Sequence, residues 1–201
     1  LVTLAQQPLP HASGPLQIIS NAAIGVQNGR ITWIGSDDDA ELLFRHAFTD
    51  PVQDITLIDA DGVVVTPGLV DSHTHLLFAG DRAEEFHLRR SGVTYAELLR
   101  QGRGILTTMQ ATRDTPSETL LELAQARLAT MRSYGTTTVE VKTGYGLDFA
   151  SEERCLRIIN NLNAPGKASA QNRNSIRVVP TFLGAHSVPP EYKERRGAYV
   201  D

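Results

Sequence analysis

Two histidines two positions apart are the residues of this chain best suited to metal chemistry. His73 and His75 close an apolar run, residues 63–70, that has no other reason to lead into two polar rings. Side chains alternate along a β-strand, so both imidazoles are expected on one side and Thr74 on the other. Two neutral imidazoles side by side form half of a divalent metal site. A bare His-x-His pair is weak evidence, but its position at the end of an apolar strand favours metal binding.

Polar side chains also follow the next two predicted strands. Lys142 and Tyr145, in the sequence KTGYG, come after the β-branched run 136–141, and His186 comes after the run 176–182. In a (β/α) barrel the active site is built beyond the carboxyl ends of the strands. A tyrosine in a glycine loop or a histidine after a strand often has only a packing or capping role. Agreement among three strands favours a shared site.

Arg82 follows His75 in the first strand-to-helix loop, within the sequence DRAEEF. Its guanidinium could bind a substrate carboxylate through two parallel hydrogen bonds. The alternative is a solvated arginine that pairs with Glu84 or Glu85, and spacing alone favours this alternative.

The elements that position these residues alternate after residue 62. Strands are predicted over 63–70, 136–141 and 176–182, with Pro67 interrupting the first, and the continuous apolar runs suggest burial on both faces. A helix is predicted over 94–100. A second is predicted to begin with Thr115 as N-cap, Pro116 as first helical residue and Glu118 as the capping-box partner of Thr115. A third is predicted to begin after an N-cap at Ser151. Residues 163–174 read as a loop. This order predicts a parallel sheet with helical crossovers, either doubly wound or an incomplete (β/α) barrel. No glycine-rich phosphate fingerprint follows the first strand, which disfavours dinucleotide binding.

Residues 1–62 are predicted to be mainly β structure without chemistry of their own. Asn28-Gly29 between the segments 22–27 and 30–34 is a strong hairpin signal, because both turn positions need positive φ. A short helix is expected over 38–48, a strand over 55–59 and a tight turn at Asp61-Gly62. His11 and His46 are expected on the surface.

Composition excludes several classes of protein. The net charge of −4 argues against a general nucleic-acid binder. The single cysteine, Cys155, excludes an intrachain disulfide framework and a multi-cysteine zinc site. No apolar run reaches the about 18 residues of a membrane span, and the first residues do not resemble a secretory signal. We therefore expect a cytoplasmic protein without a membrane partner.

The motifs together resemble a known family. PGLVDSHTH is similar to the first barrel strand of the metal-dependent amidohydrolase superfamily. The segments DRAEEF, GRGILTTMQATRD, TTTVEVKTGYGLD and TFLGAHSVPPEY resemble the imidazolonepropionases of histidine degradation. The resemblance covers nearly the whole chain. At Gly102-Arg103-Gly104 the chain departs from the three glycines usual in the family.

This resemblance implies a fold and a reaction. The fold would be α/β: residues 1–62 form the N-terminal part of a small β-sandwich, and residues 63–201 form the first three units of an incomplete (β/α)8 TIM-like barrel. The reaction would be hydrolysis of 4-imidazolone-5-propanoate to N-formimidoyl-L-glutamate, with one divalent ion, zinc or iron, supplying an acidified water. His73 and His75 match metal ligands. Arg82 matches the residue that holds the propionate, Tyr145 a substrate contact, and His186 a contact to the imidazolone ring.

The resemblance also implies that much of the site lies elsewhere. The family's third metal histidine, metal aspartate and acid/base glutamate belong to later strands, so the catalytic residue is unknown here, and no histidine follows His186. The chain is also shorter than the about 250 residues of a full barrel. We expect about the first half of an enzyme, inactive alone, with a small-molecule substrate and homodimerisation as an open question. The alternatives are another cyclic amidohydrolase or aminohydrolase, or a non-catalytic fragment.

Overall fold

The computed structural model describes residues 1–7, 9–49, 56–163 and 176–200. The backbone divides into two compact units, Leu1–Pro67 and Gly68–Asp201, and each is described by itself. Within these described ranges, none of the helices combines the length and the apolar character that a membrane crossing requires.

The first unit is organised around a β-hairpin. Strands β1 (Ala22–Gln27) and β2 (Arg30–Ser36) pair antiparallel, as the sequence predicts. The turn residues Asn28 and Gly29 have φ values of 53° and 72°, the left-handed conformation that a two-residue hairpin turn requires. Helix α1 (Asp37–Thr49) follows directly and confirms the short helix expected over 38–48. Three aspartates in its first turn favour this start, since the helix N-terminus attracts negative charge.

The strand expected over 55–59 is wrong for the residues that can be judged. Residue 55 lies outside the described residues, and residues 56–60 have no regular structure. Leu57 and Ile58 are exposed, and no described strand pairs with them, so this apolar segment lacks the ladder that would make it a strand. The turn at Asp61-Gly62 is confirmed, with both residues at positive φ. His11 is largely exposed, as expected, and lies 3.1 Å from Asp39. The side chain of residue 46 lies outside the described residues.

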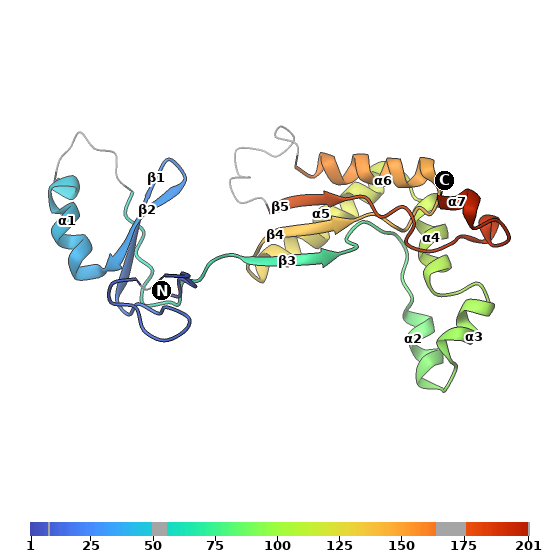
Figure 1. Ribbon diagram of the computed structural model, residues 1–201, viewed down its shortest axis with the longest axis horizontal. Coiled ribbons are helices and arrows are strands. Elements are labelled where there is room, and N and C mark those ends of the chain that lie inside the picture. Colours follow the sequence, from blue (N-terminus) through green and yellow to red (C-terminus); the bar gives the residue numbers. More distant parts are fainter. Residues whose placement is uncertain (8, 50–55, 164–175, 201) are drawn as a thin grey trace. The chain divides into compact units, whose positions relative to one another are not determined.

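The second unit is a mixed α/β structure with a parallel sheet (Figure 1). Its strands are β3 (Leu69–Thr74), β4 (Thr136–Lys142) and β5 (Arg177–Thr181), in the order β3-β4-β5. The expectation of three parallel strands with helices between them is confirmed.

The first strand differs from its prediction in place and in burial. It begins at Leu69 rather than at residue 63, and it extends to Thr74, so that it includes His73. Leu69 and Val70 are exposed, whereas burial on both faces was expected. The late start has a physical reason, since residues 63–68 have no partner strand among those described. The exposure has another, since no residue of β3 belongs to the described core cluster against which α5 and α6 pack.

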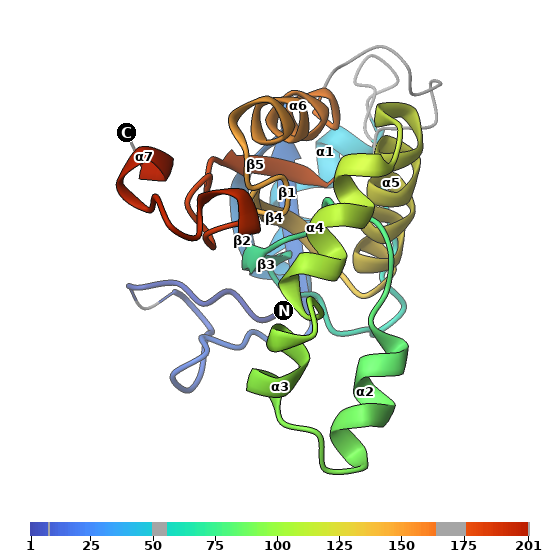
Figure 2. The same ribbon diagram turned by 90° about the vertical axis from the view of Figure 1, so that its right-hand side faces the viewer.

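In the described part of the second unit, seven helical segments accompany the sheet. They are α2 (Ala83–Arg90), α3 (Tyr95–Arg100), α4 (Ile105–Asp114), α5 (Ser117–Ser133), α6 (Phe149–Asn161), the 3₁₀ segment η1 (Pro190–Tyr192) and α7 (Gly197–Val200). Helices α5 and α6 cover the same face of the sheet (Figure 2).

Two predicted helix starts need correction. Thr115 donates its hydroxyl back to the Ala111 carbonyl, so it closes α4 instead of capping α5, and Pro116 precedes α5 without a side-chain cap. Asp148, not Ser151, caps α6, because the Asp148 carboxylate accepts from the Ser151 backbone N–H. In both cases a neighbouring polar group had better geometry for the exposed N–H or carbonyl groups. The predicted loop 163–174 lies outside the described residues apart from Asn163.

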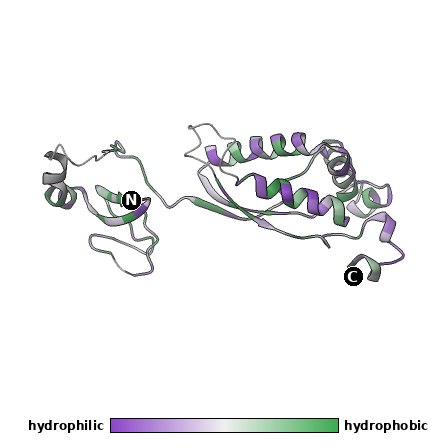
Figure 3. Cartoon of the chain, turned by 90° about the horizontal axis from the view of Figure 1, so that it is seen from above, coloured by the Kyte–Doolittle hydropathy of each residue, from purple (hydrophilic) through white to green (hydrophobic). Residues whose placement is uncertain are grey.

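The core lies between the sheet and these two helices. Val139 and Val141 of β4 are fully buried, and Ile159 of α6 and Leu120 of α5 pack with them. Figure 3 shows hydrophilic and hydrophobic residues alternating along both helices, as their amphipathic patterns require. The apolar face predicted for α6 is confirmed, since Cys155, Ile158 and Ile159 are all in the core and Leu162 packs against it.

The core position of Ile159 makes a stability prediction. Replacing Ile159 with alanine should lower the free energy of unfolding by about 2 to 5 kcal/mol, because it leaves a cavity in a packed interior. Urea unfolding followed by far-ultraviolet circular dichroism measures the loss. Phe149, which is 80% exposed on the same helix, provides the control, and Phe149→Ala should change stability little. Equal losses for the two variants would contradict this placement of the core.

Candidate functional site

The histidine pair lies at the carboxyl end of β3. His73 belongs to the strand and is exposed, whereas His75 follows it and is partly buried. Their ring centroids are 5.9 Å apart. Among the described residues, the buried Nδ1 of His75 has no hydrogen-bond partner. A buried ring nitrogen without a hydrogen-bond partner is unusual, and this nitrogen would be available to bind a ligand.

The charge state of His75 follows from its surroundings. Burial is the main cause that lowers the pKa of His75 below its ordinary value of 6.5, and the nearby His186 and His73 lower it further. These effects outweigh the backbone of Thr143, which acts in the opposite direction. His75 is therefore held in the neutral form, which is the form that binds a metal.

An aromatic cluster gathers three of the predicted site residues. The rings of His75 and His186 are stacked, with centroids 4.5 Å apart and planes at 12°. Tyr145 lies 5.1 Å from His75 and 5.7 Å from His186, centroid to centroid. The loops after β3, β4 and β5 thus bring these side chains together, as expected of the carboxyl edge of a parallel sheet.

Arg82 borders a pocket that continues this cluster. The pocket has a volume of about 290 Å³ and is lined by Phe78, Gly80, Asp81, Arg82, Thr108 and Tyr145. Because Phe78 and Tyr145 are also in ring contact, at 6.1 Å, the pocket and the aromatic cluster share a wall. The guanidinium is the cation of this lining, and a carboxylate is the group that suits it best.

The alternative reading of Arg82 as a partner of Glu84 or Glu85 is not what the structure shows. Glu84 binds Arg103 instead, through two hydrogen bonds of 3.0 and 3.3 Å. The buried carboxylate of Glu85 accepts from the backbone N–H of Gly104 and from the Thr107 hydroxyl. Arg103, at the departure from three glycines, therefore joins the segment before α4 to α2 and leaves Arg82 facing the pocket.

Phe78 is itself fixed by an arginine that the sequence did not single out. Arg127 of α5 lies over the Phe78 ring, with its central carbon 3.7 Å from the centroid. The same guanidinium donates to the carbonyls of Leu76 and Phe78. Cation–π contact and hydrogen bonds together hold the backbone that leads from the histidine pair to the pocket.

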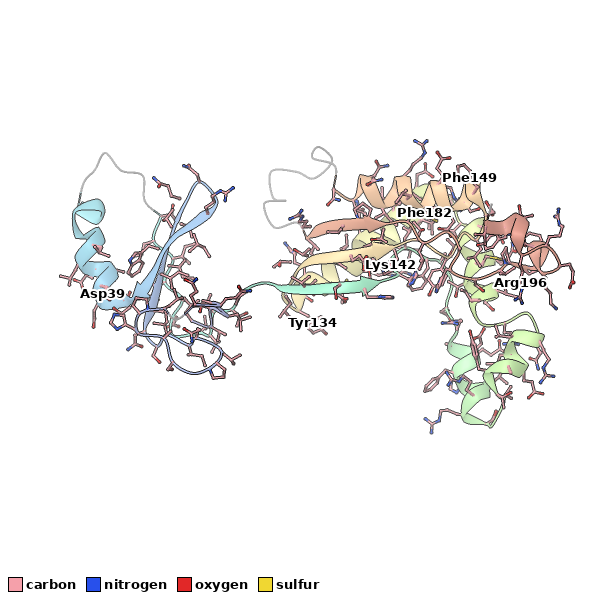
Figure 4. The ribbon with its side chains drawn as sticks, in the orientation of Figure 1. Asp39, Tyr134, Lys142, Phe149, Phe182 and Arg196 are labelled. Carbon is pink, nitrogen blue, oxygen red and sulfur yellow. The ribbon has the colours of Figure 1, made fainter. Side chains whose placement is uncertain are left out.

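Two acidic residues near the site were also missed. Glu140 of β4 accepts hydrogen bonds from the Lys142 ammonium and the Thr181 hydroxyl, both at 2.7 Å. These bonds lower the pKa of Glu140, and the bond from Lys142 has the larger effect. Figure 4 shows Lys142 near the end of β4. Glu152 of α6 is 1% exposed and binds the backbone of the KTGYG loop. Polar residues alternating with Val139 and Val141 could have signalled Glu140, whereas nothing local signals Glu152.

The donor set fits half of a metal site. His73 and His75 are two imidazoles with ring centroids 5.9 Å apart at the end of β3, and imidazole is a donor that suits zinc or iron. Within the described ranges, no group of three or more histidine, cysteine or acidic side chains is arranged to hold a metal ion. His186 is stacked on His75 rather than placed beside it as a further donor.

The lowered pKa of His75 predicts a pH dependence. As pH decreases below 6.5, the unfolded chain binds a proton at His75 before the folded chain does. The free energy of unfolding therefore decreases as pH decreases. His75→Asn removes this group. In chelator-treated protein, the loss of unfolding free energy between pH 7.5 and 5.5 should be smaller in the variant than in the unsubstituted chain. Identical pH dependences in urea titrations would contradict a buried neutral His75.

Comparison with known proteins agrees with the motifs. No protein-family model matches the chain. It is 50% identical over 184 residues to the imidazolonepropionase of Symbiobacterium thermophilum, covering 92% of this chain and 40% of the relative. It is 43% identical to the imidazolonepropionase of Shewanella baltica, with 96% of this chain and 43% of the relative covered. For that of Legionella pneumophila the identity is 44%, with 91% and 42% covered. The chain is thus related in sequence to the imidazolonepropionases over nearly its whole length, and it spans about two fifths of theirs.

Proposed function

We propose that this chain carries the substrate-recognition part of a metal-dependent imidazolonepropionase. The observation that supports this most is that the Arg82 pocket and the cluster of His75, Tyr145 and His186 share Tyr145. The reaction is hydrolysis of the cyclic amide of 4-imidazolone-5-propanoate to N-formimidoyl-L-glutamate. A substrate with a carboxylate tail and a polar ring matches a site with a cation at one end and imidazoles at the other.

Each end of the substrate has its own partners in this proposal. Arg82 binds the propionate, since its planar guanidinium can donate two parallel hydrogen bonds to a carboxylate. Tyr145 contacts the substrate between its two ends, and His186 contacts the imidazolone ring. Holding both ends restricts the ring to one orientation against the metal site, which is a large part of what an active site contributes.

The metal would be a single zinc or iron ion held in part by His73 and His75. When bound, such an ion acidifies a water molecule and polarises a carbonyl group. His75 is suited to this because its imidazole stays neutral and its Nδ1 is not engaged by any described residue. The proposal requires further ligands and an acid/base group from outside the described residues, and it implies that the isolated chain is inactive.

The fold is part of the same proposal. Residues 63–201 would be the first three units of a (β/α)8 barrel of the amidohydrolase type, with the uncovered face of the sheet lining its interior. Glu140 and Lys142 lie on that face, opposite the buried Val139 and Val141. Residues 1–62 would be part of a small β-sandwich. The enzyme would work in the cytoplasm on a small molecule, without nucleic-acid or membrane partners.

A chimaera tests the proposed function. This chain is fused to the part of the Symbiobacterium thermophilum relative that the match leaves uncovered. The fusion should consume 4-imidazolone-5-propanoate, seen as a loss of its absorbance. A chelator should abolish the activity, and zinc or iron should restore it. A fusion that folds and binds one metal ion but leaves the substrate unchanged would contradict the proposal.

The role of Arg82 is tested in the same fusion. Arg82→Ala should raise KM by about 10- to 100-fold, with a smaller change in kcat, because a charged hydrogen bond made in both ground and transition states is lost. Arg89, exposed near the end of α2, the helix that Arg82 precedes, supplies the matched control, and Arg89→Ala should leave KM unchanged. An unchanged KM in Arg82→Ala would remove Arg82 from the site.

A further inference from the structure

Glu152 is a buried carboxylate around which a site loop is folded. It is 1% exposed and lies in the first turn of α6. One oxygen accepts from the backbone N–H of Gly144 at 2.9 Å, and the other accepts from Gly146 and Leu147 at 2.7 and 2.8 Å. Hydrogen bonds to an ionised acceptor are roughly twice as strong as neutral ones. This carboxylate therefore determines the path of the loop 143–147.

The loop carries this restraint to His186. The carbonyl of Gly144 lies 2.9 Å from His186 Nδ1. A carbonyl only accepts, so Nδ1 must carry the proton of this hydrogen bond. In a neutral imidazole the other nitrogen, Nε2, is then an acceptor. The close approach needs a glycine, because Gly144 has φ of +120° and a Cβ there would lie 2.8 Å from Nδ1.

The same carboxylate places Tyr145. This residue lies between Gly144 and Gly146, whose N–H groups are both bound by Glu152. With its backbone held on both sides, the Tyr145 ring is directed towards Phe78, His75 and His186. Glu152 itself does not line the pocket. Its effect on a ligand would pass entirely through the loop.

We propose that Glu152 is a positioning residue that acts through the loop 143–147. It keeps Nε2 of His186 available as a hydrogen-bond acceptor and holds Tyr145 in the wall of the pocket. The substrate of the proposed function would place a ring N–H towards His186 Nε2 and its carboxylate towards Arg82. That placement rests on the proposed function, whereas the arrangement of loop and imidazole does not. The two parts are therefore tested separately.

The first test needs no substitution. Nitrogen-15 NMR of the histidine-labelled chain at pH 8 should show the His186 proton on Nδ1 and none on Nε2. The opposite tautomer, with the proton on Nε2, would overturn the proposal. Because the unsubstituted chain is used, this measurement tests the His186 tautomer even when a variant fails to fold.

The second test compares two adjacent glutamates. Glu152→Gln puts an amide donor against at least one loop N–H, so the Gly144 amide should exchange its hydrogen at least about tenfold faster, and His186 should lose its single tautomer. Glu153→Gln is the matched control, since Glu153 is exposed and binds Arg157. It should change neither readout. Equal acceleration throughout α5 and α6 in Glu152→Gln, or an unchanged Gly144 amide, would overturn a positioning role.

The third test addresses the ligand in the active chimaera. Glu152→Gln should lower kcat/KM by about 10- to 100-fold, mainly through KM, and Glu152→Asp should recover part of the loss because it keeps the charge. Glu153→Gln should behave as the unsubstituted fusion. Normal kinetics in Glu152→Gln would overturn the proposal. An inactive unsubstituted fusion would instead count against the proposed function, and the NMR and exchange measurements would still decide the role of Glu152.

Discussion

The arrangement of the second unit depends on burial of one face of its parallel sheet. Val139 and Val141 are fully buried beneath α5 and α6. Since side chains alternate along a strand, this burial turns Glu140 and Lys142 to the opposite face. Because the three strands are parallel, their carboxyl ends lie at the same end of the sheet, where His75, Tyr145 and His186 meet.

Above this apolar base, the site is held mainly by bonds between charged side chains and the backbone. Glu152 binds the loop after β4, and Glu85 binds the segment before α4. Arg154 donates to the carbonyls of Thr112, Arg113 and Thr115 at the end of α4. Such bonds fix irregular segments that present no continuous apolar surface to pack. They explain how loops rich in glycine can hold aromatic rings in defined positions.

Features with a local cause were predictable from the sequence. The hairpin at Asn28-Gly29, the order of the three strands and the apolar face of α6 depend on neighbouring residues or on periodicity. The meeting of His75 with Tyr145 and His186 followed from the topology alone. The helix starts predicted at Thr115 and Ser151 are wrong. The Thr115 hydroxyl binds the Ala111 carbonyl, and the Asp148 carboxylate accepts from the Ser151 N–H. The burial predicted for Leu69 is wrong because periodicity does not show which strands contribute to the core cluster. Glu152 could not be found, since its partners form a site only after the loop folds.

On the proposed function, the described residues would separate recognition from chemistry. Arg82, Tyr145 and His186 lie around one pocket and one cluster. His73 and His75 would supply two metal donors, fewer than the about three that a catalytic zinc usually takes from the protein. On the proposed function, the choice of substrate is therefore set in this part of the molecule, and the reacting water is set jointly with residues beyond it. Substitutions around Glu152 would then change which ligand binds, and those at His73 and His75 would change whether bound ligand reacts. On this proposal, the uneven distribution of metal ligands would follow from topology, because each strand of a parallel sheet delivers its own loop to the same end of the sheet.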